Sequence, residues 1–176
     1  MQITQIQVVG DTLQDRLLMR IATASHEEIR VHLTRRFVRE LWPHLVTMLA
    51  DHLSTPAASE PASAENLKAA APSTAYDEPY RNENPTYPLG STPLLASEAV
   101  LEATGPGKAR MILREARERA FTLALNAELL QGLCAMLRSA STKSGWDLSL
   151  DYSGPPANAP RTPAGTLPKP AKILLH

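Results

Sequence analysis

The chain has almost no cysteine: Cys134 is the only one among its 176 residues. A single cysteine excludes a disulfide within the chain and a zinc site built from several cysteines. Cys134 falls on the apolar side of its segment. We therefore expect a buried, inert thiol rather than a nucleophile.

The chain also lacks net charge, because 18 Lys and Arg residues balance 18 Asp and Glu residues. Zero net charge gives no overall attraction to nucleic acid or to an anionic membrane. No apolar run approaches the roughly 20 residues of a membrane-spanning helix. The N-terminus has no basic start followed by a continuous apolar stretch, so no signal peptide is expected. We expect a cytoplasmic protein that does not contact a membrane.

Proline is scarce except in two stretches, 54–93 and 153–176, which hold thirteen of the fifteen prolines. Both stretches contain few large apolar side chains, so they cannot bury enough surface to offset the entropy lost on ordering. The composition predicts a disordered linker at 54–93 and a disordered tail at 153–176. The segments 1–53 and 94–152 are expected to be ordered.

The first ordered segment has the pattern of three strands followed by a helix. "ITQIQVV" predicts a strand, and apolar residues then alternate with polar ones over 16–21 and 29–33, which is typical of half-buried strands. At Thr34 the apolar period changes from two to about 3.6, the period of an amphipathic helix. Thr34 is expected to cap this helix by accepting from its first free amides.

The second ordered segment repeats this pattern 92 positions later. Its predicted strands are 98–104, 108–115 and 120–125, with a further short strand in "GWDLSLDY". Asn126 takes the capping position. The pattern predicts an α+β fold of two pseudo-repeated β-β-β-α units, each an antiparallel meander plus a helix, packed as an intramolecular pseudo-dimer. The alternative is coincidental alternation in one irregular α+β domain.

We find no arrangement of residues that indicates catalysis. The sequence has no glycine-rich phosphate loop, no nucleophile elbow and no pair of histidines at metal-binding spacing on a helix. The five histidines are scattered. The acidic residues cluster in turns, Glu28 among them, or lie in the linker and the helices. We expect a non-enzymatic protein with no catalytic residue, no cofactor and no metal.

The strand pattern gathers basic side chains on one face of each predicted sheet. If Leu17, Met19 and Ile21 point inward, their neighbours point outward. The basic outward positions are Arg16, Arg20, Arg30 and His32 in the first unit, and Lys108, Arg110 and Arg114 in the second. Arginine binds phosphate through bidentate hydrogen bonds, so both faces are candidate nucleic-acid-binding surfaces. Alternatively, these charges only protect an exposed sheet from aggregation.

A strand meander that ends in a capped helix, as in "FTLALNAELLQGL" from Phe121, is used twice in this chain. This layout resembles the Whirly and PUR-repeat class of single-stranded nucleic-acid-binding proteins. The resemblance covers both ordered segments and is one of layout. It implies single-stranded nucleic acid as the partner.

The other interpretation is an adaptor that binds a protein partner, and a homo-oligomer is also open. Six side chains are candidate partner-binding residues: Tyr76, Tyr80 and Tyr87 in the linker, and Arg35, Arg36 and Arg39 in the first turn of the first helix. The tyrosines lie among prolines, a composition suited to docking in a groove. The arginines oppose the helix macrodipole, which indicates a surface kept for an anionic partner. The C-terminal "AKILLH" could add a strand to another sheet.

Overall fold

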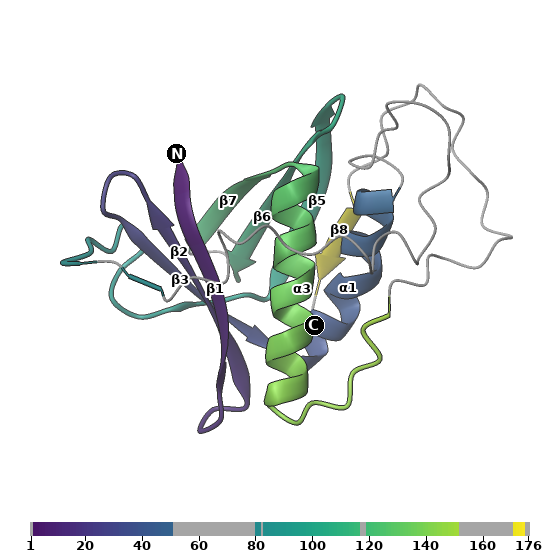
Figure 1. The fold of residues 1–176 in the computed structure, drawn as a ribbon, viewed down its shortest axis with the longest axis horizontal. Coiled ribbons are helices and arrows are strands. Elements are labelled where there is room, and N and C mark those ends of the chain that lie inside the picture. The colour runs from purple at the N-terminus through teal and green to yellow at the C-terminus, as the bar shows by residue number, and fades with distance from the viewer. Residues whose placement is uncertain (1, 51–79, 82, 117–118, 152–170, 175–176) are drawn as a thin grey trace, which may run out of the picture.

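The computed structural model describes residues 2–50, 80–81, 83–116, 119–151 and 171–174, and within them the fold is α+β (Figure 1). The elements in chain order are β1 (Ile3–Asp11), β2 (Arg16–Thr23), β3 (Glu28–Thr34), α1 (Arg35–Met48), β4 (Leu94–Leu95), β5 (Glu98–Gly105), β6 (Lys108–Glu115), β7 (Arg119–Leu125), α3 (Ala127–Lys143) and β8 (Ala171–Leu174). The described strands form two four-stranded sheets, ordered β1-β2-β3-β4 and β7-β6-β5-β8.

Each sheet is built around an antiparallel meander of three consecutive strands, as the alternating pattern predicts. Met19 pairs with Val31 across β2 and β3, and Met111 pairs with Leu123 across β6 and β7. Both residues of the second pair lie 92 positions after those of the first (19 to 111, and 31 to 123). The inward positions of these four strands are buried: Leu17, Met19, Ile21, Ile29, Val31, Leu33, Ala109, Met111, Leu113, Phe121, Leu123 and Leu125.

Both helices begin at the residues that the sequence analysis assigns as caps. Thr34 and Asn126 have extended backbone conformations directly before α1 and α3. The Thr34 hydroxyl accepts from the Phe37 amide at 3.2 Å, and the Asn126 side-chain oxygen accepts from the Leu129 amide at 2.8 Å. Each cap satisfies one of the amides that the first turn of a helix leaves free.

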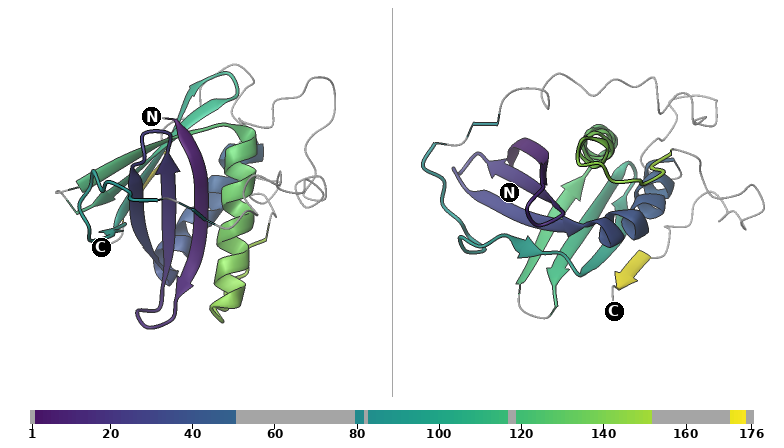
Figure 2. Two further views of the ribbon diagram at one scale, coloured as in Figure 1. Left: turned by 60° about the vertical axis from the view of Figure 1, so that its left-hand side comes forward. Right: turned by 90° about the horizontal axis from the view of Figure 1, so that it is seen from below.

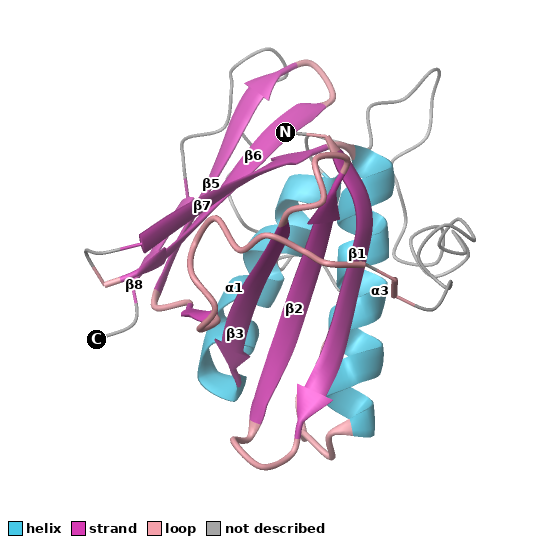
Figure 3. Ribbon diagram, turned by 90° about the vertical axis from the view of Figure 1, so that its left-hand side faces the viewer, coloured by secondary structure: helices cyan, strands magenta, loops and turns pink. Residues whose placement is uncertain are grey.

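Both helices reach the sheet to which their preceding strands do not belong. α3 packs against β1, while α1 packs against β3 of its own sheet and β5 of the other. Figure 3 shows the first meander in front of the two helices, and the right-hand panel of Figure 2 shows α3 end-on beside β1. Consequently, the buried apolar side chains of both sheets and both helices form one core.

Three parts of the fold differ from the sequence-based expectations. Residues 146–151 belong to the predicted extra strand but do not form a strand. Indole hydrogen bonds hold the two ends of this segment instead. Trp146 Nε1 donates to Asp15 Oδ1 at 2.6 Å, and Trp42 Nε1 donates to the Asp151 carbonyl at 2.8 Å. Ala171–Leu174, in the predicted tail, pairs with β5 as β8. Leu94–Leu95 joins the first sheet as β4, parallel to β3.

The predicted linker is described only in part. Residues 54–79, including Tyr76, lie outside the described residues. The part from Tyr80 to Pro93, except residue 82, runs along the first sheet and makes backbone hydrogen bonds to it. Thr86 donates to the His26 carbonyl at 2.9 Å and accepts from the Glu28 amide at 2.8 Å.

Candidate functional site

The outer face of the first sheet carries a buried acid between two arginines. Arg20 and Arg30 are directly opposite each other in the β2–β3 register, a position in which like charges repel. The Glu28 carboxylate, only 2% exposed, lies beside both. Arg20 reaches it with Nε and Nη2, each at 3.3 Å, and Arg30 Nε lies 3.9 Å from Oε1. Glu28 therefore neutralises much of the positive charge on this face.

Two predicted partner-binding tyrosines complete this cluster. The Arg20 guanidinium lies 4.0 Å from the Tyr80 ring centroid, and the Arg30 guanidinium lies 4.2 Å from that of Tyr87. The Tyr80 hydroxyl also donates to Glu28 Oε2 at 3.0 Å. Tyr80 and Tyr87 thus occupy the arginine faces that a nucleic-acid base would stack on.

Arg119, at the start of β7, anchors the end of the same segment. Its Nη1 donates to the carbonyls of Leu89 at 3.0 Å and Thr92 at 2.8 Å, and its Nη2 donates to that of Pro93 at 3.3 Å. Glu115 binds the same guanidinium, with 2.5 Å between Nη2 and Oε2. Arg30 Nη2 adds a hydrogen bond to the Ser91 carbonyl. Arginines of both sheets therefore hold the segment against the first one.

His32, a predicted nucleic-acid-binding residue, is also on the outer face but buried, with 8% of its surface exposed. Burial lowers the pKa of the imidazole, and the charges of Arg16 and Arg30 lower it further, while Asp11 partly opposes them. His32 is therefore neutral at neutral pH. It contributes no positive charge for phosphate under those conditions.

We expect His32 to make the protein less stable in mild acid. The unfolded chain binds a proton near pH 6.5, whereas the folded chain, with its lowered pKa, binds it only at lower pH. Stability is therefore lost as pH falls below about 6.5, by up to about 1.4 kcal/mol per pH unit. Urea unfolding between pH 7.5 and 5 should show a steeper fall for the natural chain than for His32→Gln. Equal pH dependence in the two would contradict this.

The outer face of the second sheet is more open but carries its own acids. The side chains of Lys108, Arg110 and Arg114 are exposed. Arg110 pairs with Glu102 directly across β5, with 2.5 Å between Nε and Oε2, and Arg114 Nη1 lies 3.9 Å from Glu98 Oε1. Such opposite charges on facing strands stabilise a sheet. The sequence-based view that acids keep to turns, linker and helices does not hold for this face.

The three arginines at the start of α1 have different surroundings. Arg35 Nη2 lies 3.2 Å from Asp15 Oδ1, and its guanidinium lies 5.5 Å from the Trp146 ring. The Trp146 indole N–H lowers the pKa of Asp15, and Arg35 lowers it further. Arg36 pairs with Glu40 one turn along the helix at 2.9 Å. Arg39 is exposed. Arg35 thus ties the β1–β2 turn to the end of α3.

Cys134 is fully buried, as the sequence predicts, and burial raises its pKa to about 12. Such a thiol is inert at neutral pH. Within the described residues, no three His, Cys, Asp or Glu side chains are grouped so as to hold a metal ion. No helix in this part of the chain has the length and apolar character to cross a membrane.

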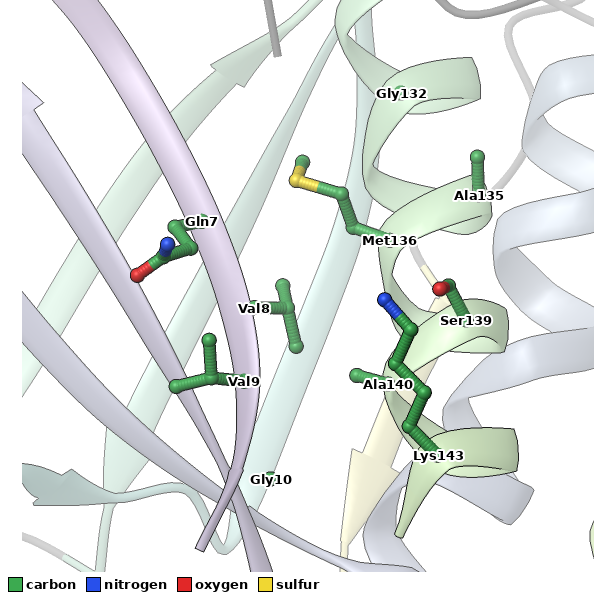
Figure 4. Close-up of a pocket in the computed structure, with 10 residues that line it drawn as sticks. All are labelled: Gln7, Val8, Val9, Gly10, Gly132, Ala135, Met136, Ser139, Ala140 and Lys143. Carbon is green, nitrogen blue, oxygen red and sulfur yellow. The ribbon is translucent and has the colours of Figure 1, made fainter. Parts of the chain in front are cut away.

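A groove of about 490 Å³ separates β1 from α3 (Figure 4). Its β1 side consists of four consecutive residues, Gln7, Val8, Val9 and Gly10. Its α3 side consists of one stripe of mostly small residues: Gly132, Ala135, Met136, Ser139, Ala140 and Lys143. At one end the elements nearly touch, since a Cβ on Gly10 would lie 2.1 Å from Ser144 Oγ. Glycine at this position therefore allows the close approach of strand and helix.

The residues that organise these surfaces, Glu28 and Arg119, are not among the site residues predicted from the sequence. The sequence pattern groups Glu28 with the acids of the turns and predicts no role for Arg119. The strand alternation itself carried a signal for Glu28, which lies two residues before Arg30 and hence on the same face. The contacts of Arg119 with residues some 30 positions away had no local signal. Comparisons with protein-family models, with curated proteins and with solved structures found no match for this chain.

Proposed function

We propose that the chain is a non-enzymatic, cytoplasmic protein that binds another protein at an open edge of its first sheet. The observation that carries this proposal is the position of β1. It is an outer strand of its sheet, and the groove beside α3 runs along it. An outer strand presents unpaired backbone amides and carbonyls, to which an extended peptide can add as a further strand.

The charges on the sheet faces support a protein partner over nucleic acid. Arg20 and Arg30 already bind Glu28 and stack on Tyr80 and Tyr87. A phosphate group would have to displace a buried carboxylate there. Since phosphate contacts supply most of the affinity of non-specific nucleic-acid binding, this face is poorly suited to bind nucleic acid.

We also infer that the two β-β-β-α units arose by duplication and pack as an intramolecular pseudo-dimer. The equal offset of 92 positions in the register of β2–β3 and β6–β7 supports this inference, and so do the caps at Thr34 and Asn126, which are also 92 positions apart. The crossing of α3 onto β1 and of α1 onto β5 is the exchange of helices that an intertwined dimer makes.

Single-stranded nucleic-acid binding is the second candidate, at the outer face of the second sheet. Its support is the exposure of Lys108, Arg110 and Arg114, with exposed Thr122 and Ala124 on the neighbouring strand, together with the layout resemblance to the Whirly and PUR-repeat class. The ion pairs to Glu102 and Glu98 weaken this candidate because they leave less uncompensated charge.

One pair of assays separates the two candidates. We expect the immobilised full chain to capture a protein in a stoichiometric complex that resists nuclease and can be rebuilt from purified components. A labelled single-stranded oligonucleotide should bind weakly even at low salt. The nucleic-acid candidate instead requires affinity that falls with salt, with a slope of roughly −0.7 per phosphate contacted.

A matched pair of triple variants completes this test. If nucleic acid is the partner, changing Lys108, Arg110 and Arg114 to Ser must weaken oligonucleotide binding. The control changes Arg36, Arg39 and Arg138 to Ser, which removes the same charge elsewhere. Tight, salt-sensitive binding that only the first triple change removes would overturn the protein-binding proposal. The matching change at Arg16, Arg20 and Arg30 is a poor probe, because two of these arginines hold Glu28.

A further inference from the structure

In the second sheet, a further strand pairs with the outer edge of the meander's first strand. β8 pairs antiparallel with β5, with Glu98 opposite Leu174 and Leu101 opposite Ala171. It also packs against α1, so that it lies along the edge of β5 with a helix beside it. The C-terminal strand therefore fills a slot between the first strand of a meander and the helix of the other unit.

The first sheet has the same slot at β1, with α3 as the flanking helix. Ile6 pairs with Ile21, and Ala99 pairs with Leu113. β5 is thus offset by 93 positions from β1 (6 to 99), while the second strand is offset by 92 (21 to 113). The β5 residues 98–101, which pair with β8, correspond to residues 5–8 of β1, and of these Gln7 and Val8 line the groove. Among the described strands, only β2 pairs with β1.

The groove has the dimensions of an added strand. Four consecutive β1 residues line it, so it follows the edge of the strand rather than one face, on which only every second residue lies. The lining residues of α3 run from Gly132 to Lys143, about 16 Å at the rise of a helix. An extended segment of five residues spans about 17 Å.

We propose that this slot binds an extended segment of a partner protein, which adds to β1 as an antiparallel strand. This inference rests on the proposed protein-binding function and on the proposed duplication. The chain's described residues supply one such strand, β8, for two equivalent edges, and β5 holds it. If two copies exchanged their β8 strands, each chain would still receive only one such strand for its two edges. Since the described residues supply no further strand for this edge, the second strand is assigned to a different protein.

The lining of the groove defines the chemistry of the segment. Gly132, Ala135 and Ala140 leave room for apolar side chains that point toward α3. Lys143 leaves α3 at the end of the groove near Gly10, and its side chain extends along the groove toward Met136 (Figure 4). In the β8 register the N-terminal end of an added strand lies at this end. We therefore assign the slot to a segment with an acidic residue at its start and alternating apolar residues after it.

Peptides derived from the C-terminal strand test this directly on the full chain. The first probe has the sequence of residues 169–176 with Lys169→Glu and Pro170→Ala, because proline lacks the amide that an added strand needs. The second keeps Lys169. We expect saturable binding by anisotropy, with the Glu peptide about two- to fivefold tighter, as expected for one exposed ion pair. In Lys143→Glu the preference should reverse.

Hydrogen exchange and two variants locate the binding. The peptide should protect the amides of β1 and leave those of β5 unchanged. Ser139→Trp, which fills the groove, should abolish binding of both peptides, whereas Arg138→Trp, the same side chain on the neighbouring exposed position, should not. Circular dichroism and urea unfolding check that both variants fold.

Several results would overturn the slot. One is protection of β5 alone, which means that the peptide replaced β8. Another is hydrogen-exchange protection of the β1 amides, in the absence of peptide, that is as strong as that of the β2 amides. This would mean that a segment of the chain itself already pairs with β1. Self-association that Ser139→Trp removes would assign the slot to a second copy. A captured partner protein whose binding Ser139→Trp leaves unchanged overturns the slot but not the proposed function. Peptide binding without any partner protein overturns only the proposed function.

Discussion

Replacing Arg20 by methionine is expected to lower the free energy of unfolding by about 3 kcal/mol, the lower end for breaking a buried ion pair. Arg20 makes two hydrogen bonds to Glu28, whose carboxylate is 2% exposed. Methionine keeps the apolar length of the side chain, but of the described side chains it leaves that carboxylate with only Tyr80 and the more distant Arg30. Burying a charge without its main partner is far more costly than losing an exposed one. Urea unfolding of the purified chain measures the loss.

Arg16 provides the matched control, because it lies in the same strand and on the same face. Among the described residues, its side chain donates to Gln14 alone, at 3.3 Å on the exposed surface. Arg16→Met should change stability by less than about 0.5 kcal/mol. Changing Glu28 to Leu together with Arg20→Met should cost much less than the sum of the two single changes, since no buried charge remains. Equal effects of Arg20→Met and Arg16→Met would contradict the role given to Glu28.

The same change should loosen the segment that follows Tyr80. Arg20 stacks on the Tyr80 ring, and the Tyr80 hydroxyl shares the Glu28 carboxylate. Without Arg20, the amides of Thr86 and its neighbours should exchange faster with solvent. The buried ion pair is therefore both a stabilising element of the sheet and the support of the segment that covers it.

Local pattern was enough to predict the two meanders and their helices. Alternation identified the inward residues of β2 and β6, such as Met19 and Met111, because a half-buried strand must alternate. Thr34 and Asn126 were recognisable as caps because the apolar period changes from two to 3.6 at those residues. Strands and caps of this kind are determined by residues that are close in the sequence, so the sequence pattern is enough to predict them.

The features that local pattern could not predict all depend on distant contacts. "GWDLSLDY" alternates like a strand, yet indole hydrogen bonds join Trp146 to Asp15 in the β1–β2 turn and Asp151 to Trp42 in α1. The C-terminal residues look too polar and proline-rich to be ordered, yet Ala171–Leu174 finds the edge of β5. The crossing of the helices also leaves no trace in periodicity, because an amphipathic helix packs equally well on either of two similar sheets.

The crossing of the helices leads to a prediction about cooperativity. Met19 of β2 and Met111 of β6 both lie in the core, and both are 1% exposed. Replacing either by alanine should lower the free energy of unfolding by about 3 kcal/mol, within the usual range for a buried methionine. Because both residues belong to one core, each change should destabilise both sheets equally.

Hydrogen exchange along a urea titration distinguishes one core from two independent units. In Met19→Ala, the protected amides of β2 and β6 should be lost at the same urea concentration, and the same should hold in Met111→Ala. α3 follows β7 of the second sheet but packs on β1 of the first, and α1 follows β3 of the first sheet but packs on β5 of the second. Unfolding of either sheet therefore exposes a helix that is connected to the other sheet. Loss of β2 protection well before that of β6 in Met19→Ala would show that the units unfold separately. α1 follows β3 directly in the chain and also packs against β5, so it links the two sheets. We therefore expect a single unfolding transition in both variants.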